Sequence, residues 1–436
     1  MPLQACLRQL TQWLDPQLLL TLAQESGFAR RTARKLTPLL LVQATVLLVS
    51  QSTVSLRRWA ALVGVLGQLC LSKQALWERL TPRASVFLQA VLAQLLARRL
   101  HLNRGAKPAA LAAFPRVLVQ DSTTIKLTPK LAAAFPGSRN QRGANHGQLK
   151  IQALYDLLAQ RFVSFRLSGF NRNDQAAAPD VLPHLRPGDL VVRDLGYFVV
   201  ASLAQMLQAG AFFLSRLRLD TGLVNARTGQ PLNLLGALKR HGQFDGEVLL
   251  GAAQLRVRLV AVKLPEAVAA ERRRKAKQNR DRRCRPNARH LALLGWAIFV
   301  TNVPRKVWRA RTVAQVYGLR WRIETIFKAW KSHFRLTEVP RGSAAQLEAM
   351  IYARLIFVTI FARTGVVGEG SAWQAESPPP FSLLKLAGLV GDFFLILCLE
   401  AWHRPVSDSW LRQLHYHGRY ERRTRKHFVQ TFMKLS

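Results

Sequence analysis

Four polar residues with helical spacing are the part of this sequence best suited to chemistry on phosphates. Tyr317, Arg320, Glu324 and Lys331 follow one another at steps of three, four and seven residues. On one helix of about 3.6 residues per turn, these steps place the four side chains along a narrow stripe. The stripe carries a hydroxyl, two cations and one carboxylate, which together can hold a phosphodiester. A solvated helix face with ion pairs has the same pattern.

Two aspartates earlier in the chain can supply further carboxylates. Asp121 ends the apolar run RVLVQD at 116–121, and Asp194 ends the run DLVVRD at 189–194. Such runs predict buried strands, and the reactive groups of open α/β sheets lie beyond the carboxyl ends of their strands. If the two strands are neighbours, the aspartates converge and Glu324 can join them. Each aspartate taken alone is equally typical of a residue that caps a turn.

Three converging carboxylates repel one another, so such a group either has raised pKa values or binds a cation. Hard oxygen ligands without histidine or cysteine select Mg²⁺, for which Mn²⁺ can substitute. Two such ions can activate a water or a 3′-hydroxyl and stabilise the leaving oxygen of a phosphodiester. The sequence therefore predicts a two-metal site for phosphoryl transfer on nucleic acid, held by Asp121, Asp194 and Glu324.

The charge of the chain indicates the same kind of substrate. Among 436 residues, 64 are Lys or Arg and 24 are Asp or Glu, for a formal net charge of +40. This excess implies a polyanionic partner, most simply nucleic acid. The basic stretches at 271–290 and 412–426 fit contacts to a DNA backbone, although solvated basic segments have the same composition.

Composition also excludes other classes of protein. The four cysteines are scattered singly, without a C-x-x-C pair or a histidine at zinc spacing, which argues against a disulfide framework and a zinc site. No apolar run is long and uninterrupted enough to span a membrane, and the first residues lack the features of a signal peptide. We therefore expect a cytoplasmic protein with no membrane partner.

The texture of the sequence changes along the chain and predicts an α/β protein. Residues 55–80 resemble a helix-turn-helix that would bind DNA, although a plain helical hairpin has the same pattern. From residue 111 the elements follow the order β-β-β-α-β-α-β, which predicts a mixed sheet with flanking helices. We expect a helical N-terminal DNA-binding region, the first part of an α/β core, a β-rich insertion, the second part of the core with the glutamate helix, and a helical C-terminal region: residues 1–110, 111–219, 220–303, 304–345 and 346–436.

The spacing Tyr-(2)-Arg-(3)-Glu-(6)-Lys resembles the signature of the bacterial insertion-sequence transposases of the IS-four group. The stretches QDSTTIKL, RDLGYF, TNVP and RWRIETIFKAWKSHF also resemble that group, and together they cover about residues 117–334. The resemblance implies an RNase H-like catalytic core, with a mixed five-stranded sheet and a β-strand insertion ahead of the glutamate helix. It also implies a bacterial protein that associates with the nucleoid.

The resemblance assigns roles to individual residues. It implies a DDE triad of two aspartates and a glutamate: Asp121, Asp194 and Glu324. It further implies that Tyr317 and Arg320 contact the phosphate beside the cleavage site and that Lys331 binds the DNA backbone. A tryptophan in the insertion of related transposases stacks on a flipped base, and Trp296 occupies the matching place, although a tryptophan that opens an apolar run is also typical of a core. Trp321 and Trp330 are expected to pack the helix.

The leading hypothesis is a cut-and-paste DNA transposase that binds terminal inverted repeats and target DNA. It hydrolyses one strand, and the freed 3′-hydroxyl attacks the opposite strand to form a hairpin, which water opens before the 3′-end joins target DNA. Because two DNA ends must be held together, we expect a homodimer in the synaptic complex, with residues 383–402 as a possible dimer contact. The alternatives are an RNase H-like nuclease without strand transfer and a catalytically decayed DNA-binding inhibitor.

Overall fold

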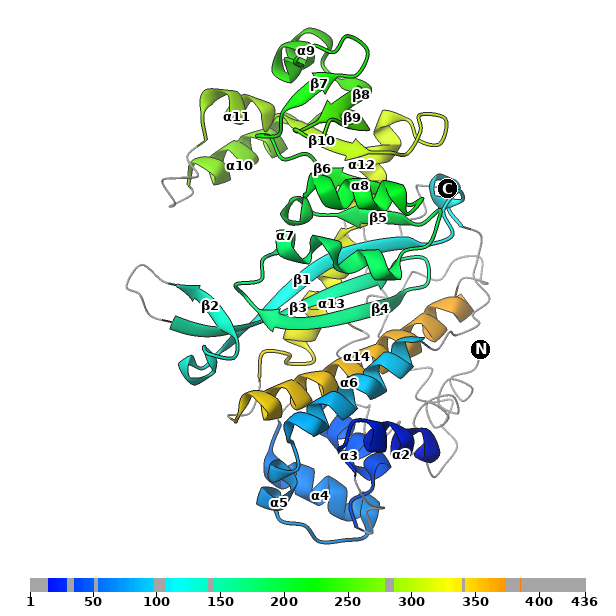
Figure 1. Ribbon diagram of the computed structural model, residues 1–436, viewed down its shortest axis with the longest axis vertical. Helices are drawn as coiled ribbons and strands as arrows, with labels where there is room; N and C mark the ends of the chain where they lie inside the picture. Colours follow the sequence, from blue (N-terminus) through cyan, green and yellow to red (C-terminus); the bar gives the residue numbers. More distant parts are fainter. Residues whose placement is uncertain are drawn as a thin grey trace.

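The computed structural model describes most of the chain, in the following segments: residues 15–29, 35–50, 54–97, 107–139, 145–278, 286–338, 342–372 and 385. Within these segments the chain forms a helical region and a large sheet with further helices (Figure 1). The basic stretch at 412–426 and the apolar run at 383–402, apart from Lys385, lie outside the described residues. The expected DNA contact and dimerisation there stay predictions.

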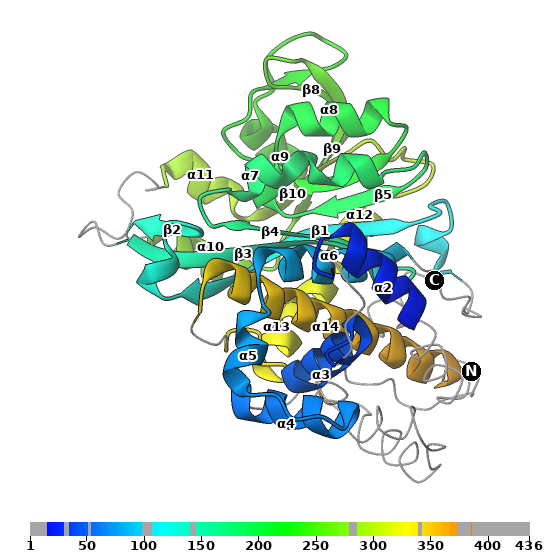
Figure 2. The same cartoon turned by 60° about the horizontal axis from the view of Figure 1, so that its bottom comes forward.

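The helical region combines the segments before the sheet with one long helix after it. Its helices are α2 (Pro16–Glu25), α3 (Pro38–Ser50), α4 (Leu56–Gly67), α5 (Lys73–Glu78), α6 (Pro82–Ala97) and α14 (Ala344–Ala372). Helix α3 is almost entirely apolar and buried over most of its length, because α2, α4 and α14 pack around it. Helix α14 also packs along α6, so the described helices before and after the sheet form one bundle (Figure 2).

The two helices predicted for residues 55–80 are present as α4 and α5. Ser72 caps α5, because its hydroxyl oxygen accepts a hydrogen bond from the backbone N–H of Ala75 at 3.1 Å. Lys73, Gln74 and Arg79 are exposed, so these side chains are accessible to a partner. DNA binding by this pair of helices stays a prediction.

The sheet is mixed, as the sequence predicted. Its strands are β1 (Val117–Leu127), β2 (Pro136–Arg139), β3 (Asn145–Asp156), β4 (Arg161–Gly169), β5 (Leu190–Arg193), β6 (Phe212–Arg216), β7 (Leu223–Asn225), β8 (Phe244–Leu250), β9 (Leu255–Lys263) and β10 (Trp296–Thr301). The order is β2-β3-β1-β5-β6-β10-β9-β8-β7, and β4 also pairs with β3. Strands β1, β5 and β6 are parallel, and the other paired strands are antiparallel.

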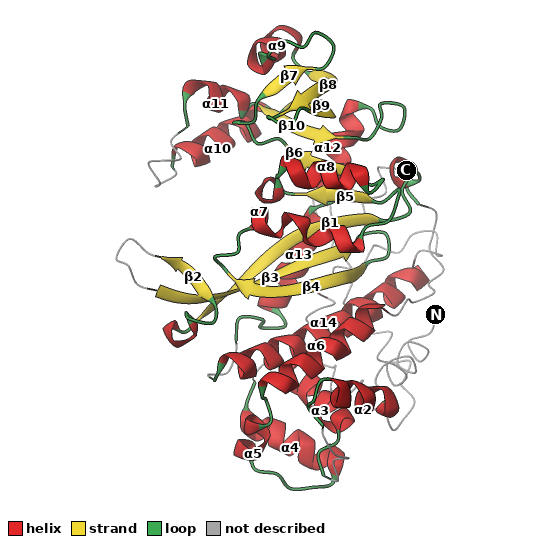
Figure 3. Ribbon diagram, in the orientation of Figure 1, coloured by secondary structure: helices red, strands yellow, loops and turns green. Residues whose placement is uncertain are grey.

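The predicted RNase H-like α/β fold is confirmed, and its sheet is larger than five strands. The five strands β4-β3-β1-β5-β6 form its core portion, and the strands from residues 220–303 continue the same sheet because β10 pairs with β6 (Figure 3). The remaining helices and 3-10 turns are η1 (Ala109–Leu111), η2 (Pro129–Leu131), α7 (Asp174–Ala177), η3 (Ala178–His184), η4 (Leu195–Tyr197), α8 (Val200–Gln208), α9 (Leu234–His241), α10 (Glu266–Lys277), α11 (Ala288–Leu293), α12 (Ala310–Gly318) and α13 (Trp321–Ser332).

Strand β1 is longer than the predicted run at 116–121, so the prediction that Asp121 ends a strand is wrong. The polar residues after Asp121 stay extended because β3 supplies backbone partners as far as the pair Leu127 and Gly147. Asp121 nevertheless lies at a boundary, because the parallel pairing of β1 with β5 ends at Gln120. Beyond Gln120, β1 still pairs with β3 but no longer with β5.

Alternation along β1 sends successive side chains to opposite faces of the sheet. Val117 and Val119 belong to the core that also contains residues of α13 and α14. Leu118 belongs to a second core with residues of α8 and of the strands β8 to β10. By the same alternation, Asp121 lies on the face of α13, and Ser122 lies on the opposite face.

The polar stripe from Tyr317 to Lys331 lies on two successive helices, so the prediction of one continuous helix is wrong. Helix α12 ends at Gly318 and α13 begins at Trp321. At the junction the backbone N–H groups of Leu319 and Arg320 bond three residues back, to Val316 and Tyr317, which tightens the chain into a turn. Glycine at 318, a weak helix former, favours the break.

Candidate active site

The register of the sheet brings the two aspartates together. Gln120 of β1 and Arg193 of β5 are the last paired residues of a parallel ladder. Asp121 and Asp194 are the next residue on each strand, and they therefore leave the ladder at the same level. Asp194 then begins the turn η4, in which the Tyr197 N–H donates to its backbone carbonyl at 3.1 Å.

Arg320 connects Asp121 to Glu324. Its Nη1 lies 3.1 Å from Asp121 Oδ2, and its Nη2 lies 2.6 Å from Glu324 Oε1. The Arg320 side chain is only 8% exposed, and its Nε is buried with no hydrogen-bond partner. Asp194 is reached from α12, because the Tyr317 hydroxyl donates to its Oδ1 at 3.1 Å. The Arg320 guanidinium lies 5.8 Å from the centroid of the Tyr317 ring, so five of the seven predicted site residues lie in one connected group.

Burial and the nearby carboxylates set the electrostatics of this group. Burial raises the pKa of Asp121 from its usual 3.8 to about 6; Arg320 and the Ser122 N–H oppose this shift, and Glu324 and Asp194 add to it. Burial and the charge of Asp194 raise the pKa of Tyr317, so its hydroxyl stays a donor. For Arg320, burial would lower the pKa, but Tyr317 and the three carboxylates outweigh it and keep the guanidinium charged.

The donor set fits a hard divalent cation in type, because it consists of carboxylate oxygens without histidine or cysteine. Asp121, with its raised pKa, is a buried carboxyl whose charge its neighbours only partly compensate. In the part of the chain that the structure describes, however, no three His, Cys, Asp or Glu side chains lie close enough together to hold an ion. Arg320 is the cation that joins Asp121 and Glu324.

Two predicted residues lie apart from this group. Lys331 is exposed in the last turn of α13, about 10 Å along the helix from Glu324. Trp296 opens β10 and is partly buried in the second core, where its indole N–H donates to the Gly242 carbonyl at 3.0 Å. This position matches the packing alternative for Trp296.

The two tryptophans of α13 differ from each other. Trp330 is 1% exposed, as predicted for a packing residue. Trp321 is 63% exposed, so the prediction that it packs the helix is wrong. The Arg320 guanidinium lies 5.6 Å from the centroid of the Trp321 ring. The exposure of Trp321 could have been expected from the sequence, because Trp321 lies three residues before Glu324 and therefore on the same side of a helix.

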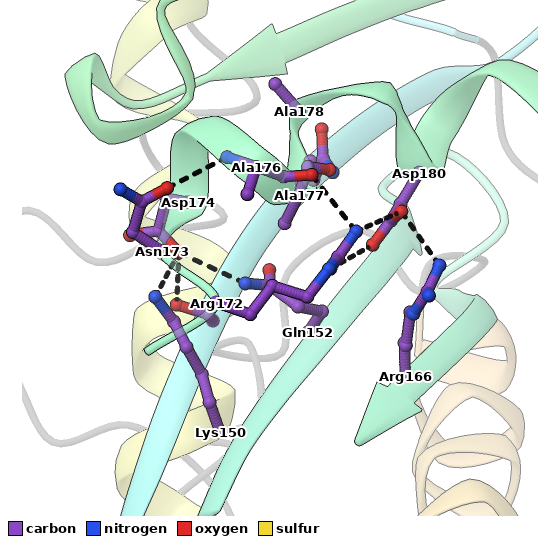
Figure 4. Close-up of polar contacts among 12 residues, drawn as sticks. Lys150, Gln152, Arg166, Arg172, Asn173, Asp174, Ala176, Ala177, Ala178 and Asp180 are labelled. Atoms are coloured by element: carbon purple, nitrogen blue, oxygen red, sulfur yellow. Dashed lines mark hydrogen bonds and ion pairs between the residues drawn. The ribbon is translucent and has the colours of Figure 1, made fainter. Parts of the chain in front are cut away.

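The sequence reasoning also missed a set of polar residues around Asp174 (Figure 4). Lys150 Nζ lies 2.6 Å from Asp174 Oδ1, and Gln152 Nε2 and the Ser122 hydroxyl donate to the same oxygen. Burial would raise the pKa of Asp174, but these three partners lower it below its usual value. The signal was present in LKIQALY, where Lys150 and Gln152 interrupt an apolar strand on one face.

Further cations lie on the insertion side of the site. Of the basic stretch at 271–290, the structure describes residues 271–278 and 286–290, and residues 271–277 form the second half of α10. Burial lowers the pKa of Arg272, nearby Arg216 lowers it further, and Tyr317 opposes them. The Nη1 of Arg272 is buried without a hydrogen-bond partner.

Comparison with known protein families identifies the chain. The model of the transposase DDE domain matches residues 112–360, which include all seven predicted site residues. The chain belongs to the DDE transposases. The family predicted from the sequence is therefore confirmed, and with it an enzyme that cuts DNA and transfers strands in transposition. DDE transposases bind DNA and generally use divalent metal ions.

Transposases of insertion sequences are among its relatives. The transposase is 30% identical over 431 residues to that of IS231B from Bacillus thuringiensis subsp. berliner, covering 93% of this chain and 88% of the relative. It is 32% identical to the transposase of IS231C from the same organism (83% and 80% covered) and 25% identical to that of IS1151 from Clostridium perfringens (80% and 77% covered).

A distant structural likeness links the transposase to the piggyBac transposase in a synaptic complex with hairpin DNA. The two chains share 10% identity at a TM-score of 0.45, over 97% of this chain and 86% of the other. Among the described residues, no helix is long and apolar enough to cross a membrane.

Proposed function

We propose that this transposase excises an insertion sequence and inserts it elsewhere by metal-dependent strand cleavage and strand transfer, with Asp121, Asp194 and Glu324 as its catalytic triad. The observation that carries the proposal is the register of β1 and β5, which releases both aspartates from a parallel ladder at the same level. Glu324 reaches the same place from α13, since it shares Arg320 with Asp121.

These three carboxylates would hold two Mg²⁺ ions, or Mn²⁺ in their place. When bound, the ions activate the attacking oxygen and neutralise charge on the leaving oxygen. The protein contributes the alignment of the ligands, and burial of Asp121 makes its charge costly until a cation compensates it.

Arg320 changes partners in this proposal. Without DNA it neutralises Asp121 and Glu324, and its buried Nε has no acceptor. A scissile phosphate at the site has two or more oxygens that can accept hydrogen bonds from the planar guanidinium. Arginine binds best to such an arrangement of acceptors. Movement of Arg320 to the phosphate leaves the carboxylates free to hold a cation. Tyr317, which stays protonated, donates a second hydrogen bond to the phosphate.

Other residues bind the DNA on either side of the scissile phosphate. Lys331 contacts the backbone from the last turn of α13. Trp321 offers an exposed ring beside the site for stacking on a base. For Trp296 we propose a stacking role that requires its indole to leave Gly242. The N-terminal region, through α4 and α5, binds the terminal inverted repeat, and the strands of 220–303 hold DNA against the core.

The order of reactions follows from one site acting repeatedly. Water breaks one strand and leaves a 3′-hydroxyl, which attacks the phosphodiester of the opposite strand and closes a hairpin. Water opens the hairpin, and the same 3′-hydroxyl attacks target DNA. Each step breaks one P–O bond of a phosphodiester and forms a new one to the oxygen of water or of the 3′-hydroxyl, with no covalent protein intermediate. A homodimer would hold both ends during these steps.

One experiment separates this function from the alternatives. The full-length protein is incubated with a labelled duplex that carries an end of its element, with Mg²⁺ and a supercoiled plasmid, and the products are resolved on denaturing gels. We expect nicked, hairpin and joined products, and no joined product from a nuclease. Asp121→Asn, Asp194→Asn and Glu324→Gln should abolish all three products while end binding persists in a mobility-shift assay. Cleavage retained in any of these variants would refute the triad.

A further inference from the structure

A buried polar network lies on the face of the sheet opposite Arg320, behind the two aspartates. In the register of β1 and β3, Gln152 is opposite Ser122, and Lys150 is opposite Thr124. Directly opposed residues share one face of a sheet, so the four side chains lie together. Lys150 and Gln152 are each 4% exposed. Polar side chains this deeply buried need partners in order to be tolerated.

Asp174, the first residue of α7, supplies the shared partner. Its Oδ1 lies 2.6 Å from Lys150 Nζ and accepts hydrogen bonds from Ser122 Oγ at 3.0 Å and Gln152 Nε2 at 3.1 Å. The second oxygen faces the turn η4, because a Cβ added at Gly196 would lie 3.1 Å from Asp174 Oδ2. One carboxylate therefore contacts β1, β3 and η4.

Through these contacts the network reaches both catalytic aspartates. The Ser122 N–H donates to Asp121 Oδ1 at 2.8 Å, while the hydroxyl of the same residue donates to Asp174. On the other side, η4 follows Asp194 directly, and the Tyr197 hydroxyl in this turn donates to Gln152 Oε1. The strand that carries one aspartate and the turn that follows the other are thus joined through the network.

We propose that Asp174 and Lys150 are a positioning pair that fixes Asp121 and Asp194 relative to each other for cation binding. An apolar residue would fill the place of Lys150 without the desolvation cost of a buried charge. The ion pair between β3 and α7 instead fixes the Asp174 carboxylate, which bonds to Ser122 of β1 and lies against Gly196 of η4. The inference rests on the proposed function, because it takes the two aspartates as the metal ligands that the pair aligns. Groups that orient metal ligands typically change metal affinity by about 10- to 100-fold.

The test compares Asp174→Asn with Asp180→Asn. Asp180 lies six residues further on, its side chain is 19% exposed against 30% for Asp174, and it pairs with Arg166 and Arg172 (Figure 4). Both variants remove ion pairs from the same segment, but of these two aspartates Asp174 is the one whose carboxylate accepts hydrogen bonds from Ser122 and Gln152. Mn²⁺ binding to the full-length protein with a pre-cleaved end duplex is followed by the electron paramagnetic resonance signal of free Mn²⁺. Mobility shift and urea unfolding are recorded in parallel.

We expect Asp174→Asn to weaken Mn²⁺ binding about tenfold and to raise the half-saturating Mg²⁺ for cleavage by the same factor, with end binding unchanged. Asp180→Asn should leave the Mn²⁺ affinity and the half-saturating Mg²⁺ concentration within twofold of wild type, even where this variant lowers the urea midpoint. Equal Mn²⁺ affinity in wild type and Asp174→Asn, or an equal loss in both variants, would overturn the positioning role.

A second variant keeps the test decisive if Asp174→Asn fails to fold. Ser122→Ala removes one hydrogen bond to Asp174 but keeps the backbone N–H that donates to Asp121. This variant should weaken Mn²⁺ binding about fivefold. No change in Mn²⁺ affinity would overturn the inference. Wild-type protein that neither binds Mn²⁺ nor cleaves its end would overturn the proposed function itself, whereas active wild type with unaffected variants would overturn the inference alone.

Discussion

Asp121 and Asp174 both bond to Ser122, one on each face of β1, yet their pKa values move in opposite directions. Burial raises the pKa of Asp121 to about 6, whereas Lys150, Gln152 and Ser122 overcome burial and lower the pKa of Asp174. The difference lies in the partners. Asp174 has a lysine close to it, but Asp121 shares Arg320 with Glu324 and has Asp194 nearby.

This contrast teaches how to distinguish a structural carboxylate from a reactive one. A partly buried carboxylate whose partners lower its pKa gains little from another cation, so Asp174 suits a positioning role. An under-compensated carboxylate in a group of like charges gains most from one, so Asp121 suits a metal ligand.

The sharpest test of the contrast exchanges each carboxylate for its amide. Asp121→Asn should lower the rate of end cleavage at saturating Mg²⁺ by at least about 1,000-fold, because a lost metal ligand removes several kcal/mol of transition-state stabilisation. Asp174→Asn should retain most of that rate at saturating Mg²⁺. Single-turnover cleavage of an end duplex measures both. Similar losses in the two variants would erase the distinction.

The pH dependence of stability should differ in sign between the two residues. Because the pKa of folded Asp121 is raised to about 6 from 3.8, its contribution to stability is lost as pH rises between these values. Wild type should therefore lose about 2–3 kcal/mol relative to Asp121→Asn between pH 4 and pH 6.5 in urea unfolding without metal or DNA. Asp174 has a lowered pKa, so the stability it contributes is lost as pH falls. Slopes of the same sign would contradict the contrast.

Removal of Lys150 should make Asp174 resemble Asp121. Lys150→Met fills a similar volume but leaves the carboxylate without its ammonium partner, so we expect a loss of about 2 kcal/mol at pH 7, recovered in part at lower pH as Asp174 protonates. Equilibrium urea unfolding at both pH values measures this. The double variant Lys150→Met/Asp174→Leu is the control and should regain stability at pH 7. Unchanged stability of Lys150→Met would mean that the pair is not a net stabilising contact.

Loss of Arg320 should sharpen the contrast from the other side. Arg320→Gln removes the cation that occupies Asp121 and Glu324, so Mn²⁺ affinity without DNA should rise about tenfold, the size of a typical coupling between competing ligands. Titration calorimetry of the DNA-free protein measures this affinity. Arg322→Gln, at a buried arginine two residues on, should not raise it. A lower affinity in Arg320→Gln would show that Arg320 does not compete with the metal.

The smallest effect is expected at Trp321, which lies outside both carboxylate groups. With 63% of this residue exposed, Trp321→Ala should change the urea midpoint little. It should reduce cleavage of an end duplex by about fivefold, which corresponds to the lower end of the about 1–3 kcal/mol that stacking on one base contributes. Trp330→Ala is the contrasting variant, because it empties a buried site and should unfold the protein at lower urea. Full activity of Trp321→Ala would remove this residue from the DNA contact.

Much of the fold followed from local patterns in the sequence. Apolar alternation and turn residues predicted the strands β1, β3, β4, β5 and β6 and a β-rich insertion, which contains β9 and β10, because these patterns depend on neighbours within a few residues. The strands β2, β7 and β8 were missed. Their pairing, and the joining of β10 to β6, depend on contacts between residues far apart in the chain.

For the candidate site, the sequence alone named residues that could carry the chemistry, because residue type and helical spacing are local properties. Asp121, Asp194, Glu324, Tyr317 and Arg320 were all named from it. How these residues are held depends on the tertiary structure. Arg320 pairs with Asp121, 199 residues earlier in the sequence, as well as with Glu324, and Asp174 bonds to Ser122 on the opposite face of β1; these contacts depend on strand register and helix packing. Without the fold, the sequence does not show which charged side chains have a nearby partner of opposite charge and which remain available to a ligand.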